Sequence, residues 1–362
     1  MSDKQYDLLV FIGRFQPFHC GHKVVVDKAL ELANNVLVLI GGENQPRTVR
    51  NPWTFEERRK MVELVYPDVS RLDTGNLRIK PLNDHTYNDD AWVKQVQERI
   101  DETETEIWGE KNQGWNDYGV GSDRKIGLIG CDKDGTSYYL KLFPHLLNEG
   151  VEFLNPINAT DIRNRMFVGN EWSIHQAADN VLPLAIARTL LDHEREPFMP
   201  HDAWAELVEE FDFLAHYRQE RGNGPFLTAD TLVECGGHIL VIERGGEYGK
   251  GTIALPGGFV EPDETFMQGA IRELREETKL KVPEPVLKGS IVATETFDQP
   301  HRDERARIVT VCHHIKLQNE LSLPKIKGSD DAAKAFWLPI SEIESTPFFT
   351  DHGFIIRKLL GV

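Results

Sequence analysis

Three carboxylates, Glu273, Glu276 and Glu277, are the residues of this sequence most clearly suited to chemistry. At spacing i, i+3 and i+4 they share one face of a helix, where they repel one another unless a divalent cation joins them. Ligation by oxygen alone suits Mg²⁺ or Mn²⁺. Hydrolysis of a phosphoanhydride requires carboxylates, a metal and a water together, so this segment predicts that reaction.

The residues around these glutamates form a pattern of fixed spacing. A Leu-Pro-Gly-Gly-Phe run at residues 255–259 precedes them, Glu264 follows Gly258 after five residues, and Arg272 follows Glu264 after seven. An arginine among crowded carboxylates predicts ion pairs with Glu264 or with the helix glutamates. A solvated acidic helix is the alternative interpretation, which the Gly-Gly run and the spacing disfavour.

This pattern resembles the Nudix motif, and its motif residues are Gly258, Glu264, Arg272, Glu273, Glu276 and Glu277. The resemblance implies that the three helix glutamates bind Mg²⁺ or Mn²⁺, that Glu276 and Glu277 are catalytic, and that Gly257 and Gly258 contact the substrate. Lys279 stands where the family has a glycine that ends the helix, so this departure touches helix termination and removes no metal ligand. We therefore expect an active hydrolase.

A second cluster begins where a short apolar run, residues 8–12, ends. The next ten residues read Gly-Arg-Phe-Gln-Pro-Phe-His-Cys-Gly-His and lead into a predicted helix. A loop that enters a helix N-terminus is a natural anion site, because free N–H groups and the positive end of the helix dipole face the ligand. His19 and His22 add donors for phosphate oxygens, and Gly21 allows close backbone approach. Alternatively, one histidine caps the turn and the other packs in it.

Two further polar segments could meet the same phosphates. In the run Asn-Ala-Thr-Asp-Ile-Arg at residues 158–163, Thr160 is placed to cap a helix and Arg163 lies one turn further along. A hydroxyl and a guanidinium at that spacing can contact one polyphosphate. Arg47 and Arg50 lie in a polar loop after a predicted strand and, taken singly, are better explained as solvated surface charges.

Together these segments resemble the nucleotidylyltransferase superfamily, and specifically the archaeal-type nicotinamide-mononucleotide adenylyltransferases, over residues 6–192. Further matches are Arg-Asn-Pro-Trp-Thr at residues 50–54, Tyr-Asn-Asp at 87–89 with Trp92, and Gly-Cys-Asp-Lys-Asp at 130–134. The implied reaction is attack by a phosphate oxygen of nicotinamide mononucleotide on the α-phosphorus of ATP, which gives NAD and pyrophosphate. The nucleophile is already ionised, so no general base is needed, and Mg²⁺ would bind the leaving pyrophosphate.

The resemblance also implies roles for individual residues of this half. His19, His22 and Arg163 would be catalytic, the two histidines acting as donors to the transition state. Asn158 stands where the family usually has serine, and a core role is the alternative for Trp92. The residues implied to bind ATP or nicotinamide mononucleotide are Gly13, Arg14, Phe15, Gly21, Arg47, Arg50, Asn51, Asn88, Trp92, Gly130, Asp132, Lys133, Asn158 and Thr160.

The substrate of the Nudix half is indicated by a Thr-Glu-Thr-Phe-Asp-Gln-Pro run at residues 294–300 and by Arg302, Arg305 and Arg307. These residues resemble a segment of ADP-ribose pyrophosphatases fused to this adenylyltransferase. The resemblance implies that Phe297 and the three arginines bind ADP-ribose, which is cleaved to AMP and ribose 5-phosphate. For the arginines, surface ion pairs are the alternative. For the domain, the alternatives are another substrate, such as NADH or a further nucleoside diphosphate derivative, and a role as a sensor of an NAD metabolite.

The first half of the chain alternates short apolar runs with helical patterns. This alternation predicts an α/β fold, a Rossmann-like parallel sheet covered on both faces, with ligands at the carboxyl ends of the strands. The predicted domain covers residues 1–192. Its predicted strands are at residues 8–12, 36–40, 77–79, 126–131 and 151–154, and its helices at 23–33, 54–66, 90–100 and from about 160. Thr54, with Glu57 three residues later, predicts a capping box at the start of the second of these helices.

A run with two prolines at residues 193–202 predicts a linker, and residues 203–362 then predict an α+β Nudix domain. Its predicted helices are at residues 203–221 and 264–278, and its β-like runs at 238–243, 286–296, 308–317 and 335–338.

The amino-acid composition limits the kinds of partner and the location that we expect. Asp plus Glu total 58 and Lys plus Arg 41, a formal charge of −17, which argues against a nucleic-acid surface. The four cysteines are scattered without a C-x-x-C pair, so zinc and disulfides are poor interpretations and a reducing cytoplasm is favoured. We find no signal peptide or membrane span, and we expect a cytoplasmic chain. Association into a homo-oligomer stays open.

Overall fold

The computed structural model describes residues 4–68, 76–109, 124–130, 142–151, 158–168, 181–191, 198–318, 322–327 and 332–362. The chain divides into two compact units, Met1–Phe211 and Asp212–Val362. The division falls inside helix α7 (His201–Arg221). Residues 193–197, half of the predicted linker at residues 193–202, lie outside the described residues, so the predicted domain limits stay predictions.

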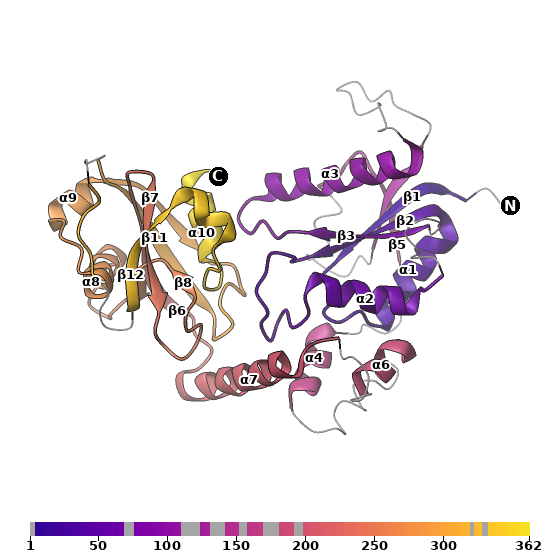
Figure 1. Cartoon of the computed structure of the whole chain (residues 1–362), viewed down its shortest axis with the longest axis horizontal. Helices are drawn as coiled ribbons and strands as arrows, with labels where there is room; N and C mark the ends of the chain where they lie inside the picture. Colours follow the sequence, from indigo (N-terminus) through magenta and orange to yellow (C-terminus); the bar gives the residue numbers. More distant parts are fainter. Residues whose placement is uncertain are drawn as a thin grey trace. The chain divides into compact units, whose positions relative to one another are not determined.

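A parallel sheet forms the first unit, as predicted. Its strand order is β3-β2-β1-β4-β5 (Figure 1), and every neighbouring pair is parallel. β1 lies between β2 and β4, so the loops that follow these strands open on one edge at the point where the strand order reverses, the usual place for a ligand. The strands are β1 (Tyr6–Gly13), β2 (Ala33–Gly41), β3 (Leu77–Leu82), β4 (Ile126–Gly130) and β5 (Leu147–Gly150). The last strand was predicted at residues 151–154, but β5 ends at Gly150, and residues 152–154 lie outside the described residues.

Helices cover both faces of this sheet. In Figure 1, α3 lies on one face, and α1 and α2 lie on the other. Side chains of β1 alternate between the two cores: Leu9 and Phe11 pack on the α1 and α2 side, Leu8 and Val10 on the α3 side, as the two-residue period of a strand requires. The helices are α1 (Cys20–Leu32), α2 (Phe55–Val65), α3 (Asp89–Trp108), α4 (Ala159–Phe167) and α6 (Leu184–Leu191).

A mixed sheet forms the second unit, the predicted α+β fold. Its main order is β10-β11-β6-β7-β12, with β8 on β7 and β9 on β6. In Figure 1, α8 and α9 lie on one face and α10 on the other. The elements are β6 (Phe226–Cys235), β7 (His238–Arg244), β8 (Ile253–Ala254), β9 (Gly257–Phe259), α8 (Phe266–Thr278), α9 (Glu284–Gly289), β10 (Ile291–Phe297), β11 (Ile308–Lys316), β12 (Ala332–Pro339), the 3₁₀ helix η2 (Ile340–Ser345) and α10 (His352–Leu360).

α8 carries both core residues and the predicted metal ligands. Thr265 caps its N-terminus and forms a capping box with Gln268, an arrangement that satisfies two free N–H groups. Ile271 and Leu274 pack into the core against β6 and β11. Truncating a buried leucine such as Leu274 to alanine costs about 2–5 kcal/mol. Packing therefore fixes the rotation of α8 and the direction of its glutamates.

One predicted strand was wrong in its first part. Residues 286–289 belong to α9, and β10 begins only at Ile291. Pro283 lies at the N-cap of α9, and Leu287 is fully buried. The two adjacent apolar residues of this short segment, Val286 and Leu287, fit a strand and one helical turn equally well.

Lys279 ends α8 in a left-handed conformation, with φ 48° and ψ 31°, and its N–H donates to the carbonyl of Arg275 at 3.0 Å. Any residue with a Cβ is strained there, whereas glycine is not. We expect Lys279→Gly to raise the free energy of unfolding by about 0.5–1 kcal/mol, measured as a higher urea midpoint. Lys279→Ala keeps the Cβ and should not stabilise; equal gains in both variants would contradict this explanation.

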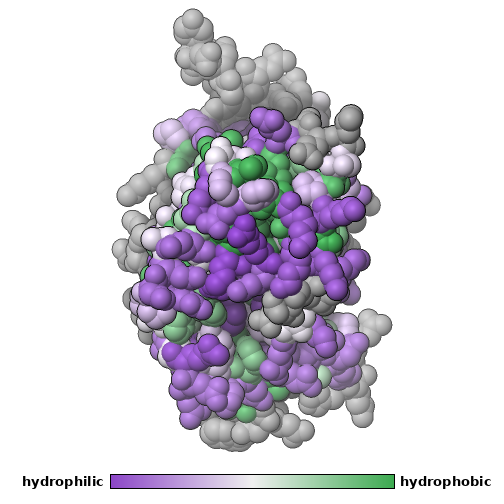
Figure 2. Space-filling model, turned by 90° about the vertical axis from the view of Figure 1, so that its left-hand side faces the viewer, coloured by the Kyte–Doolittle hydropathy of each residue, from purple (hydrophilic) through white to green (hydrophobic). Residues whose placement is uncertain are grey.

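Large hydrophobic side chains at the surface are scattered, for example Val286 and Val292, which are about half exposed. Hydrophilic residues cover much of the face shown in Figure 2. Across the part of the chain that the structure describes, every helix is too short or too polar to cross a bilayer.

Candidate functional site

The loop between β1 and α1 is shaped by aromatic packing. A Cβ at Gly13 would lie 2.9 Å from Cζ of Phe15, so only glycine fits beneath this ring. Phe15 itself is buried and has φ 52°, in the left-handed region. Its ring packs edge-on against His22, with ring centroids 4.7 Å apart. The buried ring of Phe15 therefore directs the loop toward the first turn of α1.

His19 and His22 lie side by side at the start of α1. Their rings stack with centroids 3.6 Å apart and an interplanar angle of 21°. The backbone N–H of His19 donates to Nδ1 of His22 at 3.3 Å, so a neutral His22 carries its proton on Nε2. The motif was interpreted either as a source of phosphate donors or as a helix cap. This geometry allows both, because His22 helps to cap the helix through Nδ1 and carries a donor on Nε2. Gly21 is buried between the two histidines.

Arg163 joins α4 to the same loop. It is nearly buried, and its guanidinium donates to the carbonyl of Gln16 at 2.7 Å and to Oγ1 of Thr160 at 3.1 Å. Thr160 and Arg163, which we predicted to meet one polyphosphate, therefore lie together, and their contact with phosphate stays a prediction. The predicted cap is wrong: Asn158 is the N-cap, and its side chain accepts from the N–H of Thr160 at 2.9 Å.

The arginines predicted to bind ATP have different surroundings. Arg14 is half exposed and donates to Asp84 at 2.6 Å and to Oδ1 of Asn51 at 3.1 Å, next to the histidine loop. Arg47 instead forms a two-bond ion pair with Glu57 at 2.8 and 2.9 Å. Glu57 belongs to the predicted capping box of α2, which the structure confirms. Arg50 lies partly exposed in the same polar loop.

Arg58 is a residue of this site that the sequence prediction missed. Its guanidinium donates to the carbonyls of Arg14 at 2.7 Å and Gly41 at 2.6 Å, and thereby ties together the loops after β1 and β2. Burial lowers the pKa of Arg58 to about 10. Arg58 stands at i, i+3 and i+4 with the buried Met61 and Val62, so its place on the apolar face of the helix was a readable signal.

Further residues predicted to bind ATP or nicotinamide mononucleotide lie at or after the ends of β3 and β4. Asn88 caps α3, with its Oδ1 accepting from the N–H of Ala91 at 3.1 Å. Trp92 packs against Phe143 at a centroid distance of 6.0 Å and is partly buried in the core. Trp92 therefore has the structural role that was the alternative interpretation. Gly130 ends β4. Asp132 and Lys133 lie outside the described residues.

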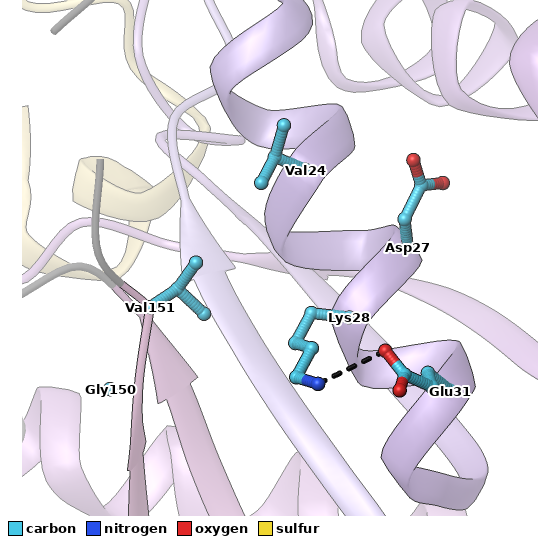
Figure 3. Close-up of a pocket in the computed structure, with 6 residues that line it drawn as sticks. All are labelled: Val24, Asp27, Lys28, Glu31, Gly150 and Val151. Atoms are coloured by element: carbon cyan, nitrogen blue, oxygen red, sulfur yellow. Dashed lines mark hydrogen bonds and ion pairs between the residues drawn. The ribbon is translucent and has the colours of Figure 1, made fainter. Parts of the chain in front are cut away.

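A pocket of about 360 Å³ lies beside α1 in the first unit (Figure 3). Its lining includes Lys28 and Glu31, which form an ion pair at 3.0 Å. The residues that line it are Val24, Asp27, Lys28, Glu31, Gly150 and Val151. None of the predicted site residues belongs to this lining.

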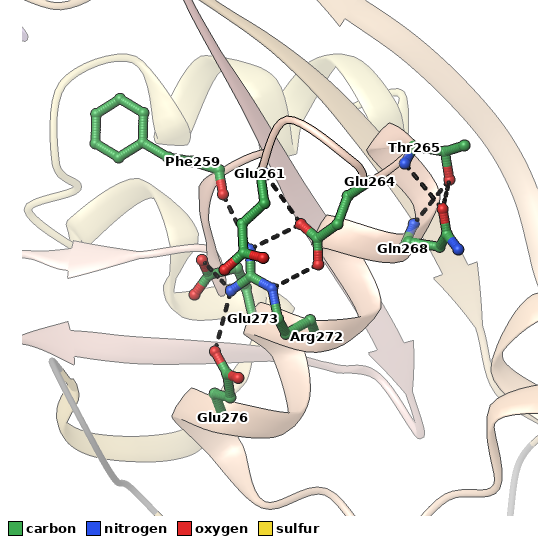
Figure 4. Close-up of polar contacts among 8 residues, drawn as sticks. All are labelled: Phe259, Glu261, Glu264, Thr265, Gln268, Arg272, Glu273 and Glu276. Atoms are coloured by element: carbon green, nitrogen blue, oxygen red, sulfur yellow. Dashed lines mark hydrogen bonds and ion pairs between the residues drawn. The ribbon is translucent and has the colours of Figure 1, made fainter.

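Arg272 is the centre of the glutamate cluster in the second unit (Figure 4). Its guanidinium donates to Glu264 at 2.7 and 3.0 Å, to Glu273 at 2.8 Å and to Glu276 at 3.1 Å. It also donates to the carbonyl of Phe259 at 3.0 Å. These carboxylates, Glu264 foremost, hold the pKa of Arg272 above its ordinary value. The predicted ion pairs of Arg272 are confirmed.

Gly257 and Gly258 allow the carboxylates to approach the backbone. The N–H of Gly257 donates to Oε2 of Glu277 at 3.0 Å, and burial raises the pKa of Glu277 to about 8. A Cβ at Gly257 would lie 2.2 Å from Oδ1 of Asp230, and one at Gly258 would lie 2.4 Å from Oε1 of Glu273. Gly257 is required because the backbone carbonyl of Ala229 also lies 2.5 Å from that Cβ position, and any side chain at Gly258 would displace the Glu273 carboxylate.

The donor set of α8 fits a divalent cation in its chemistry. Glu273, Glu276 and Glu277 supply only carboxylate oxygens, the ligands that Mg²⁺ and Mn²⁺ accept. Figure 4 shows Glu273 and Glu276 both directed at Arg272. Within the described ranges, no three His, Cys, Asp or Glu side chains already surround a common metal position.

The three arginines predicted to bind ADP-ribose have partners within the second unit. Arg302 donates twice to Asp351, at 2.8 and 2.9 Å, and both side chains are more than nine-tenths buried. Arg305 forms an ion pair with Asp303 at 2.7 Å, and Arg307 donates to the carbonyl of Asp298. Arg302 and Arg305 thus form ion pairs, which was the alternative interpretation, but these pairs lie inside the unit and not on its surface. Their role toward substrate stays a prediction.

The buried Arg302–Asp351 ion pair should contribute to the stability of the second unit. Arg302→Met would leave Asp351 buried without its cation, which should lower the free energy of unfolding of this unit by about 3 kcal/mol. Arg302→Met combined with Asp351→Leu removes both charges and should recover most of that loss. Urea unfolding of the full chain checks both variants; a double variant as weak as the single one would refute the explanation.

One aromatic residue, Phe297, and one further arginine, Arg244, complete this site. Phe297, predicted to contact substrate, is almost fully buried at the end of β10. Arg244, which the sequence prediction missed, ends β7 with its guanidinium 4.0 Å from the centre of the Phe349 ring. Burial and the neighbouring Arg305 lower the pKa of Arg244, while Glu277 is among the carboxylates that raise it. Arg244 thus adds positive charge beside the glutamate helix.

The geometry defines two classes of domain: a nucleotidyltransferase-like α/β unit with a histidine loop after β1, and a Nudix unit with glutamates on α8. The Cytidylyltransferase-like family model matches residues 10–114, and the NUDIX domain model matches residues 227–359. The first match covers the histidine loop, α1, α2 and α3 but not α4, and the second covers the glutamates of α8.

Individual relatives narrow the assignment. The chain is 34% identical to the nicotinamide/nicotinic acid mononucleotide adenylyltransferase of Acinetobacter baylyi over 166 residues, 46% of this chain and 78% of the relative. It is 31% identical to the ADP-ribose pyrophosphatase of Methanocaldococcus jannaschii over 136 residues, 38% of this chain and 73% of the relative. The chain therefore belongs to the nicotinamide-mononucleotide adenylyltransferases and to the Nudix ADP-ribose pyrophosphatases.

A solved structure spans both units. The crystal structure of a bifunctional NMN adenylyltransferase/ADP ribose pyrophosphatase from Francisella tularensis, complexed with AMP and a manganese ion, superposes with a TM-score of 0.79 at 28% identity. The match covers 98% of this chain and 99% of that chain.

Proposed function

We propose that this chain is a bifunctional enzyme of NAD metabolism. The first unit transfers AMP from ATP to nicotinamide mononucleotide and releases pyrophosphate. The second unit hydrolyses ADP-ribose to AMP and ribose 5-phosphate. Support comes from the relatives of each half and from the two sites, each built from residues of one unit.

The stacked His19–His22 pair beside Arg163 carries the first assignment. The phosphate of nicotinamide mononucleotide is already ionised at neutral pH, so catalysis consists of alignment and charge stabilisation. Nε2–H of His22 is a fixed donor, because Nδ1 accepts the N–H of His19. Arg163 and the half-exposed Arg14 add positive charge at the same loop. We expect these groups to stabilise the charge on the phosphates as pyrophosphate leaves.

Glu273, Glu276 and Glu277 carry the second assignment, as the residues that would hold Mg²⁺ or Mn²⁺. A manganese ion is present in the Francisella tularensis crystal structure. A bound divalent ion supplies positive charge to the diphosphate oxygens. Arg272 orients Glu273 and Glu276, and the N–H of Gly257 orients Glu277. Mg²⁺ on the pyrophosphate of ATP would serve the first unit in the same way.

The partners that we propose are ATP, nicotinamide mononucleotide, NAD and ADP-ribose, in the cytoplasm. A formal charge of −17 disfavours nucleic acid. The local arginines and helix N-termini, rather than the field of the whole chain, would attract the anionic substrates.

A product assay on the purified chain with Mg²⁺ tests both halves. One sample receives ATP and nicotinamide mononucleotide, and the other receives ADP-ribose. NAD in the first and AMP with ribose 5-phosphate in the second are expected. NAD alone would overturn the ADP-ribose assignment and direct the second unit to a panel with NADH and other nucleoside diphosphate derivatives; neither product would overturn both assignments.

A further inference from the structure

The segment before α10 lies along β8 like an additional strand. Ile253 and Phe348 form a parallel bridge, in which the N–H of Ile253 donates to the carbonyl of Pro347 at 3.1 Å. The N–H of Phe349 donates back to the carbonyl of Ile253 at 2.7 Å. In a regular parallel ladder the next bond would run from the N–H of Leu255 to the carbonyl of Phe349.

A histidine side chain makes that next bond instead. The carbonyl of Phe349 accepts from the N–H of His352 at 3.0 Å, as the chain turns into α10. Nδ1 of His352 accepts from the N–H of Leu255 at 3.0 Å. Burial, with Arg302 nearby, holds the pKa of His352 well below its ordinary value, so the ring is neutral and Nδ1 keeps the lone pair that this bond needs.

Leu255, the donor of this bond, lies two residues before Gly257 of the hydrolytic site. The carbonyl of Pro256 accepts from the N–H of Thr231 at 2.9 Å, and Gly257 then donates its N–H to Glu277 at 3.0 Å. These three bonds hold three consecutive residues: His352 holds Leu255, Thr231 holds Pro256, and Gly257 holds the carboxylate. A shift of Leu255 would therefore move the Gly257 N–H relative to Glu277.

The position of His352 is itself fixed by its neighbour. Asp351 is the residue before it, and the carboxylate of Asp351 is held by two hydrogen bonds from the buried guanidinium of Arg302. The first residues of α10 thus cannot slide along β8 without breaking this ion pair. Arg302 acts here through Asp351 and His352.

We propose that His352 is a positioning residue of the hydrolytic site, whose imidazole fixes the Leu255–Gly258 loop and thereby the Glu277 carboxylate. The proposal rests on the proposed hydrolase function of the second unit. An amide acceptor at the same place should replace the imidazole, since Oδ1 of asparagine overlays Nδ1 of histidine. A residue of similar volume without an acceptor should not.

The experiment compares His352→Asn with His352→Leu in the full chain. His313→Leu is the matched control, because His313 is an equally buried histidine whose Nδ1 contacts Thr294 on β10. Three quantities are measured: kcat and KM for ADP-ribose, Mn²⁺ affinity without substrate by electron paramagnetic resonance, and hydrogen exchange of the segment that contains Gly257. NAD synthesis and the unfolding midpoint report on folding.

We expect His352→Leu to lower kcat about 10- to 100-fold, the scale of a small misplacement of reacting groups, with a smaller change in KM. Its Mn²⁺ affinity should fall about tenfold and exchange at Gly257 should accelerate, while His352→Asn and His313→Leu stay within a few-fold of the wild type. If His352→Leu does not fold, His352→Gln, whose acceptor is displaced by one methylene, takes its place.

Two results would overturn the proposal: wild-type kcat and Mn²⁺ affinity in His352→Leu, or equal losses in His352→Asn and His352→Leu. A wild-type chain without ADP-ribose hydrolysis would refute the proposed function, whereas Mn²⁺ binding and exchange at Gly257 would still decide the role of His352.

Discussion

A chain carrying Glu276→Gln should lose ADP-ribose hydrolysis on the order of 10³-fold and should make NAD at the unaltered rate. The Glu276 side chain is about half exposed and accepts one hydrogen bond from Arg272 at 3.1 Å. Glutamine has the same size and can keep that bond, so α8 and its core contacts should persist. What the substitution removes is a negative charge from the predicted metal ligands. Product formation is measured for both reactions on one preparation.

Glu284→Gln is a matched control for Glu276→Gln. Glu284 begins α9 in the same unit, is similarly exposed, and pairs with Arg275 at 3.2 Å and Lys288 at 2.8 Å. Its loss should leave hydrolysis within twofold of the wild type. If Glu276→Gln abolished both reactions with folding intact, the assignment of one site to each unit would be refuted.

His19→Ala should have the converse effect and lower NAD synthesis about 10²- to 10³-fold, the usual cost of removing one donor to a transition state. His19 is almost buried, and its ring stacks on His22 at 3.6 Å. The alanine variant loses this ring at the loop where the phosphates are expected. Initial rates of NAD formation at saturating ATP and nicotinamide mononucleotide check the prediction, with ADP-ribose hydrolysis as the internal reference.

A second variant separates catalysis from helix capping. His22→Gln places a glutamine at the third position of α1, where a glutamine completes a capping box. It should preserve the start of α1 and still lose NAD synthesis, because the imidazole donor is gone. Full activity in His22→Gln would mean that the motif serves the fold alone.

The sequence predicted best those features that depend on neighbours within one helical turn. The Thr54–Glu57 capping box and the Arg272 ion pairs both appeared as expected. The alternation of strands and helices also sufficed for the parallel sheet, because parallel strands need crossover helices. Such features are encoded by spacing alone.

Features that depend on distant partners were not predicted. Asp351 lies 49 positions from Arg302, and no local pattern connects the two. Arg302 was therefore predicted to bind substrate, with a surface ion pair as the alternative, and its buried partner was not foreseen. His352 reaches Leu255 across 97 positions. Arg58 lies on the apolar face of α2, a local signal that the prediction did not use, but the carbonyls that explain its burial belong to residues 44 and 17 positions away. Tertiary pairing, not local preference, set these positions.

The two glycines before α8 constrain how this gene can evolve. A methyl group at Gly257 would meet Asp230, and one at Gly258 would meet Glu273, each within 2.5 Å. At Gly257 a shorter side chain at position 230 would not make room, because the backbone carbonyl of Ala229 would lie 2.5 Å from the same methyl group. At Gly258 the Glu273 side chain would have to swing aside, which moves a proposed metal ligand. Neither glycine can therefore change in a single step that leaves the site as it is. In descendants that keep hydrolysis both glycines should stay unchanged, and in descendants that abandon it Gly258 and Glu273 should mutate together.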